Sequence, residues 1–208
     1  MADGNGCVVF VEDDPALREA LLALMDSVGM TAKAYGSVQE YLDAPAVTGP
    51  HCLVLDVRLP GRSGLDLQAE LARGGASPPI VFLSGHADVP MSVRAMKAGA
   101  IEFLVKPFRD QDLIDAIHHG IEEDRRRRAG QTAEAELRLR FDSLTPRARE
   151  VMRLVAQGLL NKQIAGMLDV SEITVKVHRG QAMRKMGARS LAELVRMADQ
   201  LGVCAADR

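Results

Sequence analysis

Five short apolar runs alternate with helix-like segments across the first 120 residues, and this alternation is the strongest constraint on the fold. The runs are predicted strands, at Cys7–Glu12, Thr31–Tyr35, Cys52–Asp56, Ile80–Ser84 and Ile101–Lys106. Helices are predicted between them, at Pro15–Val28, Val38–Ala44, Leu65–Arg73, Val89–Ala98 and from Arg109 onward. Strands that alternate with helices in this way predict an α/β fold, with a parallel sheet covered by helices on both faces.

Polar side chains follow four of the predicted strands. They are the acidic pair Asp13-Asp14, then Asp56, Ser84 and Lys106. The ends of parallel strands meet at one edge of an open sheet, where ligands bind. Carboxylate oxygens suit Mg²⁺, and a carboxylate beside a metal can act as a nucleophile toward phosphorus. We therefore expect Asp56 to accept a phosphoryl group, with Lys106 and Ser84 stabilising its oxygens.

A phosphatase of the haloacid dehalogenase type is the alternative for this pattern, because it also uses Mg²⁺ and an aspartate that follows a strand. Such an enzyme needs a second aspartate two residues later as a general acid, and here that position is Arg58. We therefore expect a phosphoacceptor that assists its own phosphorylation and dephosphorylation, not an enzyme acting on a separate substrate.

Charge is divided unequally along the 208 residues. Residues 1–124 contain 9 Lys and Arg against 19 Asp and Glu, whereas residues 125–208 contain 17 against 9. An acidic half joined to a basic half predicts two domains with different partners, of which the basic one suits nucleic acid. The three cysteines form no CxxC pair, and no apolar stretch is long enough to span a membrane. Both observations favour a cytoplasmic protein without a membrane partner.

The segment 123–142 is a predicted charged helical linker between a domain at 1–122 and a domain at 143–208. Acidic residues precede arginines by four positions, as in Glu122–Arg126 and Glu134–Arg138, and such pairs support an exposed helix. A flexible connector is the alternative, with Gly130 as its weakest point.

Four helices and no strands are predicted after Phe141. Thr145-Pro146 begins the first, Asn161 is expected to cap the second, Ser171 caps Glu172–Met186, and Ser190 caps the last. The short join between the second and third helices is typical of a helix-turn-helix.

The helix Glu172–Met186 has two distinct faces. Val175, Ala182 and Met186 form an apolar stripe for a small core, and Lys176 and Arg179 lie on another face that can enter a major groove. We expect base or phosphate contacts from Lys176 and Arg179. Five further basic residues are expected at DNA phosphates, namely Arg147, Lys162, Arg184, Lys185 and Arg189.

The motifs of the first 120 residues, from VVFVEDD to EFLVKPF, resemble the receiver domain of response regulators. The resemblance implies a flavodoxin-like (βα)5 fold with strand order 2-1-3-4-5 and phosphorylation at Asp56. It also implies Mg²⁺ ligation by Asp14, Asp56 and the backbone carbonyl of Arg58, with Asp13 acting through water. Ser84 would close on the phosphoryl group and Lys106 would pair with it. Phe103 would be an aromatic switch, and core packing is the alternative role for that ring.

Residues 144–197, with LTPRAREV and the run from GLLNKQIAGMLDV to AMRKMG, resemble an all-α, four-helix LuxR-type helix-turn-helix domain. That resemblance puts Val177 and Gly180 at base-facing positions. The whole chain resembles the NarL/FixJ class of response regulators, and within it the FixJ/StyR branch.

This class implies a transcription regulator of a two-component system. The expected partners are a sensor histidine kinase, double-stranded promoter DNA, RNA polymerase and, after phosphorylation, a second copy of the chain. The alternative keeps DNA binding but makes the receiver a passive dimerisation domain.

Overall fold

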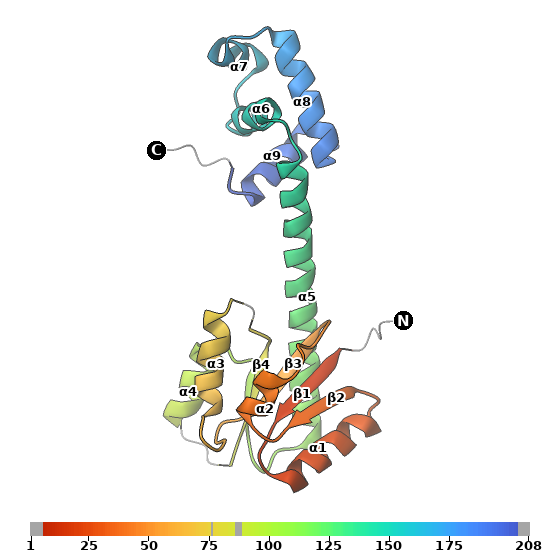
Figure 1. Cartoon of the computed structure of the whole chain (residues 1–208), viewed down its shortest axis with the longest axis vertical. Helices are drawn as coiled ribbons and strands as arrows, with labels where there is room; N and C mark the ends of the chain where they lie inside the picture. Colours follow the sequence, from red (N-terminus) through yellow and green to blue (C-terminus); the bar gives the residue numbers. More distant parts are fainter. Residues whose placement is uncertain (1–5, 76, 86–88, 204–208) are drawn as a thin grey trace. The chain divides into compact units, whose positions relative to one another are not determined.

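The computed structural model describes residues 6–75, 77–85 and 89–203, and it divides the chain into two compact units, 1–128 and 129–208 (Figure 1). The division falls inside the segment 123–142 that the sequence marks as a linker. Ala87, which belongs to the receiver-like motif, and Cys204 lie outside the described residues.

The first unit contains a five-stranded parallel sheet. Its strands are β1 (Cys7–Val11), β2 (Thr31–Tyr35), β3 (His51–Asp56), β4 (Ile80–Ser84) and β5 (Glu102–Val105). The sheet order is β2-β1-β3-β4-β5, which confirms the predicted 2-1-3-4-5 topology. Observed and predicted strands differ only at their ends, because hydrogen bonding decides where a strand stops.

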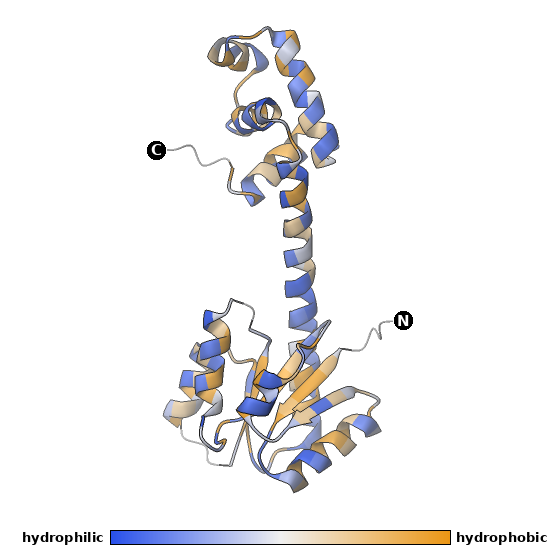
Figure 2. Cartoon of the chain, in the orientation of Figure 1, coloured by the Kyte–Doolittle hydropathy of each residue, from blue (hydrophilic) through white to orange (hydrophobic). Residues whose placement is uncertain are grey.

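Helices cover both faces of this sheet. They are α1 (Pro15–Ser27), α2 (Val38–Asp43), α3 (Gly64–Arg73), α4 (Val89–Lys97) and the first part of α5 (Asp110–Asp142). Successive strand residues point to opposite faces. Val8 and Phe10 of β1 therefore share a core with α1 and α5, whereas Val9 and Val11 share a core with α2, α3 and α4. Figure 2 shows the resulting contrast between apolar strands and mixed helices.

Helix α5 continues through residues 123–142, so this segment is helical as predicted and Gly130 does not interrupt it. The helix contributes side chains to a core at each end. Leu113, Ile117 and Ile121 pack against the sheet, and Leu137 and Phe141 pack in the core of the second unit.

Asp124 on α5 is a buried carboxylate that ties the helix to the start of β3. Its Oδ2 accepts hydrogen bonds from the backbone N–H of His51 at 3.0 Å and from Nε of Arg128 at 2.6 Å, and its Oδ1 accepts from Arg127. Burial opposes the ionisation of Asp124. The bonds from the two arginines and His51 outweigh burial and hold the pKa of this carboxyl below its usual value.

The second unit is built from α6 (Pro146–Ala156), α7 (Asn161–Leu168), α8 (Glu172–Met186) and α9 (Leu191–Gln200) around one core. Thr145, Ser171 and Ser190 cap their helices as predicted. The expected cap at Asn161 is wrong: Leu160 occupies the cap position, and its backbone N–H is satisfied by the side chain of Gln163 at 2.8 Å. No helix among the described residues is long and apolar enough to cross a membrane.

Two glycines of α5 should respond oppositely to alanine. A Cβ at Gly120 would lie 2.6 Å from Sγ of the buried Cys52, whereas nothing lies within 4 Å of a Cβ at Gly130. We expect Gly130→Ala to raise the free energy of unfolding by up to about 1 kcal/mol through helix propensity. Gly120→Ala should lower it by roughly 1–3 kcal/mol through overpacking. Urea unfolding of the full chain, followed by circular dichroism, measures both. Equal effects would contradict the packing described for Gly120.

Candidate phosphoryl-acceptor site and DNA-binding helix

The carboxyl ends of β1, β3, β4 and β5 bring the candidate site together. Glu12 and Asp13 follow β1, Asp56 ends β3, Ser84 ends β4 and Lys106 follows β5. Because β1, β3, β4 and β5 are successive neighbours in the sheet, these side chains meet at one edge although nearly a hundred residues separate the first from the last. The sequence-based expectation that Asp13, Asp56, Ser84 and Lys106 follow four strands at this edge agrees with the structure.

Three carboxylates form the centre of the site. One oxygen from each of Glu12, Asp13 and Asp56 lies within 4.8 Å of the others. Glu12 and Asp56 are buried, and Asp13 is exposed. The sequence analysis did not single out Glu12, and it placed Asp14 among the clustered carboxylates.

Asp14 has a different role in the structure. Its Oδ1 accepts hydrogen bonds from the backbone N–H groups of Ala16, at 2.9 Å, and Leu17, at 3.4 Å, so it caps α1. The acids after β1 that cluster with Asp56 are therefore Glu12 and Asp13, and Asp14 lies at the start of α1. The signal for this was present in the sequence, because an acid before Pro15 is the usual cap of a helix that begins with proline.

Lys106 links two of the carboxylates. Its Nζ lies 2.5 Å from Oδ2 of Asp56 and 2.7 Å from Oε2 of Glu12. Burial, together with the negative charge of Asp56, raises the pKa of Glu12 against the opposing effect of Lys106. Burial lowers the pKa of Lys106, but its hydrogen bonds to Asp56 and Glu12 outweigh this and raise it. Lys106 is therefore held as an ammonium ion.

The charge of the site fits a divalent cation. The three carboxylates are opposed by the single ammonium of Lys106 among the described residues of the group, which leaves two negative charges close together. Carboxylate oxygens at this spacing are the donors that Mg²⁺ uses. The backbone N–H of Arg58 donates to Oδ1 of Asp56 at 2.8 Å, so both oxygens of this carboxylate are engaged.

Arg18 of α1 holds the backbone of Glu12 and Asp13, the acidic segment after β1. The sequence alone did not single it out. Its Nη1 donates to the backbone carbonyls of Glu12, at 2.8 Å, and Asp13, at 3.0 Å. These two bonds hold the chain direction after β1, and therefore the positions from which the two carboxylates project.

Ser84 and Phe103 lie where strands β4 and β5 pass the site. Ser84 is fully buried, and its backbone carbonyl accepts from the N–H of Lys106 at 2.8 Å. The half-buried ring of Phe103 lies 6.2 Å from that of Phe82, centroid to centroid, at the edge of the core. Both roles considered for Phe103 are compatible with this position.

The recognition-like helix α8 has the two faces that its sequence predicts. Val175, Ala182 and Met186 are its buried residues. Lys176, Val177 and Gly180 are exposed on other faces. Arg179 is half-buried, and its Nη1 donates to Oδ1 of Asn161 at 3.3 Å; its contact with DNA stays a prediction.

The other basic residues of the second unit divide into exposed and engaged groups. Lys162, Arg184 and Arg189 are exposed. Arg147 joins α6 to α7, because it donates to the carbonyl of Leu168 at 2.6 Å and pairs with Glu150 at 2.8 Å; its predicted phosphate contact stays a prediction.

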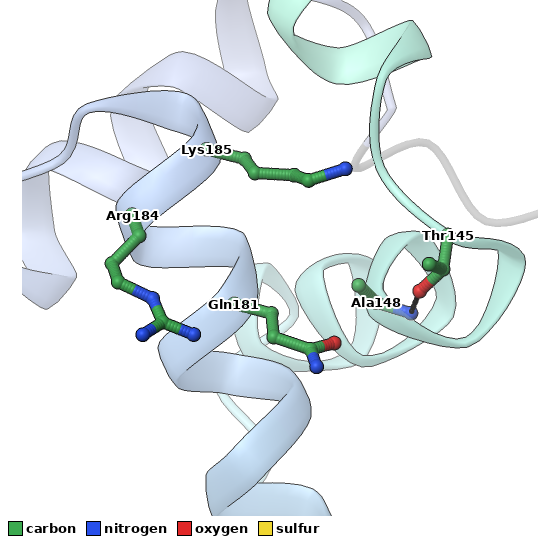
Figure 3. Close-up of a pocket in the computed structure, with 5 residues that line it drawn as sticks. All are labelled: Thr145, Ala148, Gln181, Arg184 and Lys185. Atoms are coloured by element: carbon green, nitrogen blue, oxygen red, sulfur yellow. Dashed lines mark hydrogen bonds between the residues drawn. The ribbon is translucent and has the colours of Figure 1, made fainter.

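A pocket of about 320 Å³ lies between α6 and α8 (Figure 3). Two of the residues that line it are basic residues expected to contact DNA phosphates. Arg184 and Lys185 line it together with Thr145, Ala148 and Gln181. Lys185 reaches across to the chain before α6, where its Nζ donates to the carbonyl of Ser143 at 2.5 Å.

Comparison with known proteins gives two family matches. Residues 8–118 match the response regulator receiver domain, and residues 142–198 match the bacterial regulatory proteins of the luxR family. Together these matches cover most of the chain and coincide with its two compact units.

Similar proteins match this chain over nearly its whole length. Nodulation protein W of Bradyrhizobium diazoefficiens is 52% identical over 98% of this chain and 90% of its own length. The solved structure of the response regulator StyR is 44% identical, covers 95% of this chain and 100% of its own, and has a TM-score of 0.84. Full-length FixJ from B. japonicum is 40% identical over 95% of this chain and 97% of its own, with a TM-score of 0.56.

The strand order, the acidic site at the sheet edge, the helix-turn-helix and these similarities agree with the predicted NarL/FixJ class. The chain belongs to the response regulators of two-component systems, and it joins a receiver domain to a LuxR-type DNA-binding domain.

Proposed function

We propose that a sensor histidine kinase phosphorylates Asp56 in the presence of Mg²⁺, and that phosphorylation promotes dimerisation and binding to promoter DNA in the cytoplasm. The observation that carries this proposal is the buried Asp56 carboxylate, with its Oδ2 2.5 Å from the Lys106 ammonium, inside a group of three carboxylates. The protein would itself assist both the gain and the loss of the phosphoryl group. RNA polymerase is a further proposed partner at the promoter.

Glu12, Asp13 and Asp56 would hold the metal, together with the backbone carbonyl of Arg58. The ion would supply positive charge that lets an anionic phosphoryl group approach an anionic carboxylate. This assignment replaces the role first expected for Asp14, whose carboxylate is occupied in capping α1.

The residues of the site would share the work of transfer. An oxygen of Asp56 forms a bond to phosphorus as the bond from phosphorus to the kinase histidine nitrogen breaks, and that nitrogen keeps the bonding electrons. Both oxygens of Asp56 already have partners, at Lys106 and at the amide of Arg58. A phosphoryl group on either oxygen must displace one of these partners. Lys106 would then pair with the phosphoryl oxygens and Ser84 would close on them, and Phe103 would turn inward.

Asp13 and Asp14 provide a test of the metal assignment by the same substitution at adjacent positions. Asp13→Asn should weaken Mg²⁺ binding by roughly tenfold or more, because a direct carboxylate ligand is lost. Asp14→Asn should leave Mg²⁺ affinity nearly unchanged, since asparagine caps helices about as well as aspartate. Calorimetric titration of the full chain with Mg²⁺ measures both. A larger loss of Mg²⁺ affinity in Asp14→Asn than in Asp13→Asn would show that Asp14 is the metal ligand.

Asp56 should be the phosphoryl acceptor on which the output depends. In the wild-type chain, a small phosphodonor with Mg²⁺ should give a labile phosphoryl adduct, and beryllofluoride should raise both the dimer mass and the affinity for duplex DNA. Asp56→Asn should lose all three responses, whereas Asp26→Asn, an exposed carboxylate on α1, should keep them. Mass spectrometry, light scattering and a DNA-binding titration provide the measurements. An unchanged response in Asp56→Asn would leave the receiver as a passive dimerisation domain.

The proposed dimer uses the surface formed by α4 and β5. Val89, Val93 and Met96 on α4, with Val105 on β5, are all more than two-fifths exposed, and α4 and β5 pack against each other. Exposed apolar residues gathered in this way mark a surface that is covered by a partner.

A charge at Val93 tests this surface. Val93 is 45% exposed on α4, and Val28 at the end of α1 is 43% exposed, so the two positions are matched in burial. Val93→Lys should abolish the beryllofluoride-induced dimer but keep Mg²⁺ binding, because a buried unpaired ammonium is costly at an interface. Val28→Lys should retain both properties in the same light-scattering experiment. A dimer that persists in Val93→Lys would place the contact elsewhere.

A further inference from the structure

Ile173, near the start of α8, is an apolar side chain with almost no cover. It is 73% exposed, and Val177, four residues later, is 53% exposed. Residues four apart lie one above the other on a helix. Ile173 and Val177 therefore form one apolar strip, which we call the α8 strip. It is separate from the buried stripe that contains Val175.

The strip continues into an open position. Gly180 follows Val177 by three residues on the same face, and nothing lies within 4 Å of a Cβ built there. The exposed face of α8 thus presents two apolar side chains and then bare backbone, so that a partner can approach the helix closely along this line.

The surroundings of the α8 strip are positively charged. On α8 the exposed cations Lys176, Arg184 and Lys185 outnumber the one exposed acid of that helix, Glu172, and neither Lys176 nor Arg184 takes part in an ion pair within the described residues. An apolar strip with a basic rim is poorly suited to pairing with a second copy of itself, because the rims would repel. It is suited to a polyanion with apolar groups at its centre.

The major groove of duplex DNA is such a partner. Its floor carries one apolar group, the C5-methyl of thymine, which distinguishes thymine from the other bases when an apolar side chain contacts it. Phosphates flank the groove on both sides and attract the basic rim. The second helix of a helix-turn-helix enters the groove with its N-terminal residues at the bases, and that is the part of α8 where Ile173 lies.

We propose that Ile173, together with Val177, reads thymine methyl groups in the operator. Ile173 is thereby a specificity-determining residue, in addition to the base-facing positions expected from the family resemblance. This inference rests on the proposed binding of the second unit to duplex DNA.

Removal of single methyl groups from the DNA tests the inference. Duplexes selected from a random library by the full chain with beryllofluoride and Mg²⁺ provide the operator, and each thymine is then replaced in turn by deoxyuridine. At one or more thymines in each half-site, the loss of the methyl group should weaken binding about fourfold at constant salt, the value of one buried methylene-sized group.

The protein variants complete a double-mutant cycle. In Ile173→Ala, the deoxyuridine penalty at one of these thymines should disappear, because the side chain that contacts the methyl group is absent. Leu139→Ala is the matched control: Leu139 is 71% exposed but lies on α5, so its variant should keep the full penalty. Both substitutions are at exposed positions, and circular dichroism checks that folding is unchanged.

Four outcomes would overturn the inference. Deoxyuridine without effect at every thymine, or a penalty unchanged in Ile173→Ala, would refute methyl readout while phosphorylation-dependent DNA binding stands. A change in oligomeric mass in Ile173→Ala, with DNA affinity intact, would instead assign the strip to contacts between copies. Failure to select any duplex would refute the proposed function itself, and the inference with it.

Discussion

The contact of Lys106 with Glu12 and Asp56 is the interaction on which the receiver site depends. Two buried carboxylates side by side would repel each other and lose their hydration, and the ammonium between them offsets both costs. The same contact joins the ends of three strands that are distant in sequence. A group added to Oδ2 of Asp56 must displace Lys106, and Lys106 follows directly after β5, which packs against α4. The charge balance at the sheet edge is thereby connected to the apolar surface that we propose for dimerisation.

Helix α5 shows how one element can serve two cores. Its first turns pack under the sheet and its last turns pack among α6 to α9, so both ends are held by apolar burial. The segment between them is mostly exposed and rich in charge, and its ion pairs contribute little individually. Asp124 is different, because its buried carboxylate fastens the helix to the backbone of His51 just beyond the last receiver core residue, Ile121. Removal of that carboxylate would leave two arginines without their partner and the His51 N–H without its acceptor.

The features that follow from periodicity could be predicted from the sequence, and those that depend on distant contacts could not. Alternation of strands and helices predicted a parallel sheet, and the resemblance to receiver domains implied its strand order. Helical spacing predicted the buried stripe of α8 at Val175, Ala182 and Met186. Three consecutive acids after β1 carry no periodic signal, and the position of Asp14 before Pro15 is the one sequence feature that marks this residue as a helix cap. Asp124 lies in the segment predicted as an exposed, charged helix, and its burial could not be predicted because its partner at His51 is 73 residues away.

The same limit applies to Arg179, whose bond to Asn161 of α7 could not be predicted from helical spacing. Composition and spacing favour Arg179 as a base contact, but its guanidinium is held by Asn161 of α7. Gly180 has no side chain to offer, which leaves Lys176 as the exposed cation at the centre of the helix. If α8 binds DNA as proposed, hydrogen-bonded readout would be sparse, and the discrimination between bases would fall largely on its apolar residues. A helix that depends on methyl contacts distinguishes thymine from cytosine by a few-fold at each position. Several modest contacts, repeated in two half-sites by a dimer, would then multiply into a usable specificity, which gives phosphorylation-dependent pairing a direct role in sequence selection.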